Sequence, residues 1–123
     1  MKIKEPSLNH YFPKEIVEID ASIHSLIMKF NKAGYKTFAC CSGLPEDHEG
    51  PEKGFTFYIS FCELINDKFS NHARSKGFVW DLWRNTTWLG QGKSTTHDDI
   101  RSLFVDFHKM LDDDLKLYGR FGK

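Results

Sequence analysis

The sequence predicts a single α+β domain, residues 1–123, in which three helices cover one face of a mainly antiparallel four-stranded sheet. A chain of 123 residues is long enough for one hydrophobic core and too short for two independent ones. Apolar residues recur at steps of three and four in some segments and alternate in others. These segments follow the order helix, strand, strand, helix, strand, strand, helix, which favours antiparallel pairing with helices packed over the phenylalanine-rich side.

The first helix is expected over residues 16–33, where the apolar residues are spaced by three and four. Gly34 follows directly and is suited to end the helix in a left-handed conformation. Residues 1–14 are expected to be irregular because Pro6 and Pro13 interrupt them. The apolar stripe of this helix consists of Ile16, Ile19, Ile23, Leu26, Ile27 and Phe30.

Two strands are expected next, over residues 35–40 and 55–61, joined by a long polar loop. The second of them alternates regularly, so that Phe55, Phe57, Ile59 and Phe61 share one face. That face is expected to lie against the helices.

The second half of the chain predicts a weaker helix over residues 63–76 and two strands over 78–84 and 86–89. A long helix is expected after Thr96, because Asp99 three residues later completes a capping box. This order of elements brings the loop after the first strand and the loop before the last helix to the same end of the sheet.

A small-ligand or anion pocket is therefore expected between Cys41–Gly43 and Gly90–Ser94. Ser42 and neighbouring backbone N–H groups are the expected donors, and Lys93 is expected to supply positive charge at the start of the helix. His48 is expected to gate the pocket. The predicted ligand-binding residues are Cys41, Ser42, Gly43, His48, Gly92, Lys93 and Ser94. No catalytic residue or cofactor follows from the sequence.

A zinc site is not expected, although Cys40, Cys41, His48 and Cys62 are residue types that bind zinc. Adjacent cysteines on a strand point to opposite faces. Cys62 lies at the far end of a seven-residue strand, about 20 Å away. A structural role for the thiols is favoured instead.

Two kinds of enzyme are also disfavoured. A nucleophilic Cys41 needs a base or positive charge nearby, whereas His48 is flanked by Asp47 and Glu49. The Gly-Lys-Ser sequence beginning at Gly92 is typical of a phosphate-binding loop, but Thr87 stands where that motif requires glycine.

Exposed aromatic residues suggest a second function, that of a non-enzymatic protein-interaction module. On a strand, Trp80 and Trp83 face opposite ways, so one of them is expected outside the core. Exposed tryptophan often marks a partner surface. A homodimer is one arrangement that this alternative leaves open.

The overall charge is balanced, with 17 Lys and Arg against 17 Asp and Glu. Such a chain has no global field to attract nucleic acid, so nucleic acid is a disfavoured partner without being ruled out. The three cysteines are expected to be free thiols. The sequence has no signal-type segment and no apolar run of about 20 residues, which predicts a cytoplasmic protein with no membrane partner.

The succession of a helix, a Gly-Tyr-x-Thr strand and a Cys-Ser-Gly loop resembles two groups of proteins. One is a set of small uncharacterised bacterial and phage proteins with a Ser-Cys-x-Gly-His loop. The other is the wybutosine-synthesis methyltransferase family, which modifies a guanosine of tRNA with S-adenosylmethionine. This resemblance implies a shared α+β scaffold and, as a third alternative, a nucleotide- or RNA-modifying enzyme. The matching residues are Gly34, Tyr35, Thr37, Cys41, Ser42 and Gly43, while Cys40 and Leu44 depart from both patterns.

Overall fold

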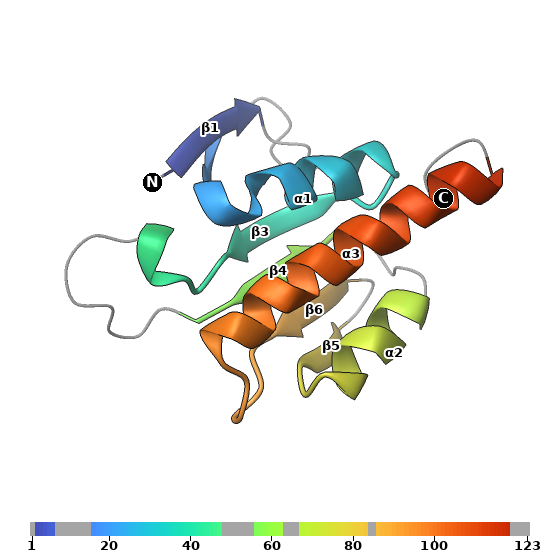
Figure 1. Cartoon of the computed structure of the whole chain (residues 1–123). Coiled ribbons are helices and arrows are strands. Elements are labelled where there is room, and N and C mark those ends of the chain that lie inside the picture. The colour runs from blue at the N-terminus through green and yellow to red at the C-terminus, as the bar shows by residue number, and fades with distance from the viewer. Residues whose placement is uncertain (1, 7–15, 48–55, 63–66, 84–85, 119–123) are drawn as a thin grey trace.

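The structure, a computed structural model, describes residues 2–6, 16–47, 56–62, 67–83 and 86–118 (Figure 1). These residues form a four-stranded antiparallel sheet in the order β3 (Thr37–Cys41), β4 (Tyr58–Phe61), β6 (Thr86–Gly90) and β5 (Val79–Trp83). A two-stranded sheet is formed by β1 (Lys2–Pro6) and β2 (Ile16–Asp20). Three helices lie on one side of the larger sheet (Figure 1). The predicted α+β class and its four-stranded antiparallel sheet are confirmed. The helices are α1 (Ala21–Lys32), α2 (Asp67–Ser75) and α3 (His97–Tyr118), and a short 3-10 helix, η1 (Pro45–Asp47), follows β3.

The first helix begins later than the sequence predicts. Residues 16–20 form strand β2, which pairs with β1, so the prediction of a helix over them is wrong. The prediction of irregular structure is likewise wrong for residues 2–6, whereas residues 7–15 lie outside the described chain. The apolar spacing over so few residues does not distinguish a helix from a strand, and pairing with residues 2–6 decides between them.

The strand register of the larger sheet places the ends of two of its strands in one row. Cys41 pairs with Tyr58, Tyr58 with Gly90, and Gly90 with Val79, so these residues form one row at one end. Strands β3 and β6 both finish in this row. The loop that follows Cys41 and the loop that follows Gly90 therefore leave the sheet at the same end.

The core is built from aromatic rings contributed by all three helices and by the sheet. Phe30 of α1 lies 5.2 Å from Phe61 of β4, 5.3 Å from Phe69 of α2 and 5.6 Å from Phe107 of α3, measured between ring centroids. These four side chains are fully buried. All the contacts are edge-to-face, the arrangement that ring quadrupoles favour. The predicted face with Phe57, Ile59 and Phe61 is therefore the helix-covered face of the sheet.

The last helix has the start that its sequence predicts. The Thr96 backbone N–H donates to Asp99 Oδ2 at 2.8 Å, and the Asp99 N–H donates to Thr96 Oγ1 at 3.1 Å. This reciprocal pair satisfies backbone donors that the helix leaves free. Among the described residues, neither α3 nor either of the other helices combines the length and the apolar character needed to cross a membrane.

Candidate functional site

A buried polar cluster lies at the end of β3, in the loop from which the ligand pocket is predicted. Ser42 is fully buried, and the carboxylates of Asp20 and Asp47 are almost so. The Ser42 backbone N–H donates to Asp20 Oδ2 at 2.8 Å, and its hydroxyl donates to Asp47 Oδ2 at 2.5 Å. The same hydroxyl accepts a hydrogen bond from the Leu44 N–H at 3.1 Å. Ser42 therefore joins the end of β3 to Asp20, which precedes α1, and to Asp47 in η1.

Asp47 also supplies the cap of α1. Its Oδ1 accepts a hydrogen bond from the Ser22 backbone N–H at 3.1 Å, in the first turn of the helix. The residue preceding the helix, Asp20, makes no such side-chain cap bond, because its carboxylate is turned toward Ser42. A helix start is thus satisfied by a carboxylate 25 residues away.

An ion pair holds η1 against α3 and so supports the position of Asp47. Arg101 Nη2 donates to Glu46 Oε1 at 2.8 Å. This hydrogen bond lowers the pKa of the Glu46 carboxyl and raises the pKa of Arg101. Both side chains are exposed, so the pair positions the turn more than it stabilises the fold.

The sequence-predicted site residues are only partly brought together. Ser42 and Gly43 are buried, Cys41 is half-buried, Gly92 is half-buried, and Lys93 and Ser94 are exposed. His48 lies outside the described residues. Because β4 runs between β3 and β6, the two loops start about 10 Å apart.

The backbone of Phe57 lies between the two loops. Its N–H donates to Gln91 Oε1 at 3.1 Å, and the Gln91 N–H donates to the Phe57 carbonyl at the same distance. On its other side, a Cβ placed on Gly43 would lie 2.4 Å from the Phe57 nitrogen. Both loops therefore pack onto the segment that precedes β4.

The chemistry of this region differs from that of the predicted anion site. The Ser42 N–H and hydroxyl are the donors that such a site needs, and both are bonded to carboxylates. Two nearby carboxylates also disfavour a bound anion. The pocket between the loops stays a prediction. The sequence does not predict Asp20 as a site residue, because a helix beginning at residue 16 places Asp20 inside it rather than at its cap. Asp47 is missed because its contact with Ser22 joins residues that are 25 positions apart.

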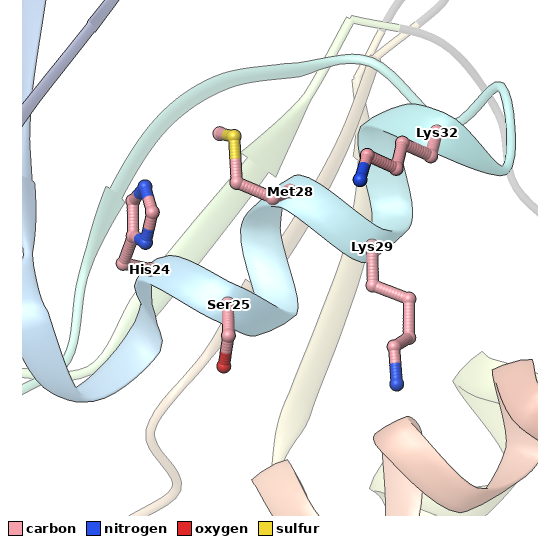
Figure 2. Close-up of a pocket in the computed structure, with 5 residues that line it drawn as sticks. All are labelled: His24, Ser25, Met28, Lys29 and Lys32. Atoms are coloured by element: carbon pink, nitrogen blue, oxygen red, sulfur yellow. The ribbon is translucent and has the colours of Figure 1, made fainter.

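A groove of about 340 Å³ lies along α1, away from the predicted site (Figure 2). Two of its lining residues contact α3. Ser25 Oγ is 3.4 Å from His108 Nε2, and Lys29 Nζ is 2.9 Å from Asp112 Oδ1. The positive charge of Lys29 is therefore already paired. The described residues that line the groove are His24, Ser25, Met28, Lys29 and Lys32.

The same α1–α3 contact predicts a pH dependence of stability. Burial lowers the pKa of His108 below its ordinary value of 6.5, and the charge of Lys29 lowers it further, while Asp112 opposes them. Between the folded and unfolded pKa values, the unfolded chain binds more protons, so stability falls as the pH decreases through this window. We expect the H108Q variant to lose less stability than the wild type between pH 7 and pH 5, as measured by urea unfolding at each pH. Equal losses in the two proteins would contradict this assignment.

The face of the sheet opposite the helices is hereafter called the open face. Figure 1 shows that none of the described helices lies on it. Phe38 is 46% exposed, Trp88 39% and Val79 37%. The Trp88 indole lies over Gly90, in the space that a Cβ there would occupy. The described residues that the register places on the open face are Lys36, Ala39, Cys41, Tyr58, Ser60, Cys62, Val79, Asp81, Thr86, Trp88 and Gly90. Phe38 lies at the register shift between Thr37 and Ala39.

The register also settles which way the described aromatic and thiol side chains point. Trp80 is on the core side and is 7% exposed, whereas the side chain of Trp83 lies outside what the structure describes. Cys40 packs against the core, and Cys41 lies on the open face. Cys40, Cys41 and Cys62 are not assigned to any disulfide. Adjacent cysteines on opposite faces agree with the alternation that argued against a shared metal.

Within the described segments, no group of three or more His, Cys, Asp or Glu side chains is arranged to hold a metal ion. Comparison of the chain with protein-family models, with curated proteins and with solved structures gives no significant match.

Proposed function

We propose that this protein is a non-enzymatic protein-interaction module whose contact surface is the open face of the sheet. The observation that carries the proposal is the exposure of Trp88 on the central strand β6 and of Val79 on the neighbouring strand β5. Phe38, which is also exposed, lies on the edge strand β3. Tryptophan and phenylalanine are enriched at the centres of protein interfaces. A one-sided sheet whose second face is aromatic in this way is suited to bury it against a partner.

The distribution of charge supports the same function. Lys36 and Asp81 are the only charged residues among the described members of the open face, and they lie at opposite edges of the sheet. The central strands contribute aromatic, small and hydroxyl side chains. Interfaces commonly have such an uncharged centre with a charged rim.

The ligand pocket and the RNA-modifying enzyme have less support from the geometry, since the Ser42 donors are used within the protein. A thermal-shift panel with S-adenosylmethionine, nucleotides and inorganic phosphate tests both. An unchanged melting temperature throughout counts against them. A clear shift with one ligand would favour a binding site over a pure interaction module.

The proposed function is tested by comparing two surface variants as immobilised bait. Trp88→Thr removes the indole but keeps a residue that favours strands. Val105→Thr is the matched control, because Val105 is 67% exposed on α3 and so lies on the helix side. We expect a binding partner, whether a second copy or another protein, to be retained by wild type and V105T. We expect the W88T bait to bind it at least tenfold more weakly.

Circular dichroism and thermal melting must first show that the W88T bait is folded. Equal binding by all three baits, or equal loss in both variants, would overturn the assignment of the open face as the contact surface.

A further inference from the structure

We infer that the open face binds the open face of a second copy, in a two-fold dimer whose axis runs parallel to the strands. This inference rests on the proposed function and names its partner. It is carried by the charges at the two edges of the face and by the side chains of its central strands.

The two charges of the open face have opposite signs and lie on opposite edges. Lys36, whose carbonyl accepts the Cys62 N–H at 2.8 Å, directly precedes the edge strand β3. Asp81 lies on the other edge strand, β5, in the row of Trp88 and Ser60. Both side chains are exposed. Measured along the strands, Lys36 lies about 7 Å from the row of Asp81, which is the spacing of two residues on one face of a strand.

A two-fold axis parallel to the strands exchanges the edges of the sheet while keeping positions along the strands. Strand β3 of one copy then lies over β5 of the other. Lys36 comes within reach of the second copy's Asp81, and symmetry repeats this contact at the opposite edge. Opposite charges at the rim of an interface set its register and orientation.

A two-fold axis that lies in the plane of the interface but perpendicular to the strands gives a worse match of charges. It places β5 over β5, so that the Asp81 carboxylates of the two copies approach each other when the interface is centred on that row. Like charges at an interface are unfavourable. The distribution of charge therefore selects one orientation.

The central strands also complement each other in the selected orientation. Strand β6 of one copy lies over β4 of the other, because these two strands occupy the middle of the sheet. The Trp88 indole leans over Gly90, which shares a row with Tyr58, so each indole faces Tyr58 of the second copy. Packed sheets are about 10 Å apart, and aromatic side chains that meet across that gap pair favourably.

The inference is tested by charge exchange, with the association constant measured by sedimentation equilibrium at low ionic strength. We expect wild type to dimerise, and K36E and D81K each to weaken the dimer at least tenfold, because each variant places like charges at both edges. We expect the K36E/D81K double variant to recover most of the affinity. A mixture of the K36E and D81K chains should also form a heterodimer, since both of its edges then pair opposite charges.

Raising the salt concentration to 1 M should reduce the difference among the variants, since exposed charge pairs are screened. A wild-type protein that stays monomeric up to about 1 mM overturns the inference. A dimer that the single variants leave intact, or that the double variant does not restore, overturns the orientation. If wild type is monomeric but binds a different protein, and the W88T bait alone fails to retain that protein, the proposed function stands and the inference fails.

Discussion

Replacement of Asp47 by alanine is expected to lower the free energy of unfolding by about 3 kcal/mol. The substitution removes the acceptor of the fully buried Ser42 hydroxyl and the acceptor of the Ser22 N–H at the start of α1. Hydrogen bonds to charged groups contribute roughly 1.5–3 kcal/mol each, and a buried donor left without a partner adds a desolvation cost. Urea unfolding followed by circular dichroism measures the change.

The neighbouring residue provides the control for this prediction. Glu46 belongs to the same turn and also bonds across the fold, to Arg101, but both side chains are exposed. Because exposed ion pairs contribute little, E46A should lose much less stability than D47A. Similar losses in the two variants would mean that the turn, rather than the buried carboxylate, stabilises the loop. D47N should fall between wild type and D47A, because the amide can accept from Ser22 but has no acceptor to replace both carboxylate oxygens.

Replacement of Gly43 by alanine is expected to cost about 4 kcal/mol. Gly43 has a φ of 66°, in the left-handed region, where a side chain costs roughly 1–2 kcal/mol. A Cβ there would also lie 2.4 Å from the backbone nitrogen of Phe57. Since backbone cannot move aside as a flexible side chain can, the loop or the start of β4 must shift.

Gly77 provides the control that separates the backbone penalty at Gly43 from the close approach to Phe57. Its φ of 89° is also positive, but among the described residues a Cβ there would meet only the Thr95 methyl group, at an ordinary contact distance of 3.7 Å. G77A should therefore show the backbone penalty alone, about 1–2 kcal/mol. Denaturant midpoints of both variants at one pH provide the comparison. If G77A is as destabilised as G43A, the close approach of Gly43 to Phe57 is not the source of the larger effect.

Both predictions concern the loop that the sequence favours as a ligand site. In the structure this loop is a structural junction, in which Ser42, Asp20 and Asp47 join the end of β3 to the start of α1. A junction of this kind uses the Ser42 donors within the protein. The exposed aromatic residues of the open face, which the sequence suggests only as an alternative, are the feature on which the proposed function rests.

Local patterns alone determined much of the fold. Alternation in β4, the spacing of apolar residues in α3 and the Thr96–Asp99 capping box each depend on residues close in sequence. Strand directions followed from the order of the elements, since strands that are consecutive in the chain commonly become neighbours in a sheet. For the same reason, the shared end of the two loops could be predicted.

Tertiary contacts decided the features that depend on distant residues. Residues 16–20 became a strand because residues 2–6 pair with them, and Asp47 became a helix cap because folding brings it to Ser22 from 25 residues away. The sequence assigned Ser42 a donor role for a ligand, whereas packing directs those donors to buried carboxylates. Patterns of three and four residues carry no information about such pairings, which are selected by the burial of polar groups that must all find partners.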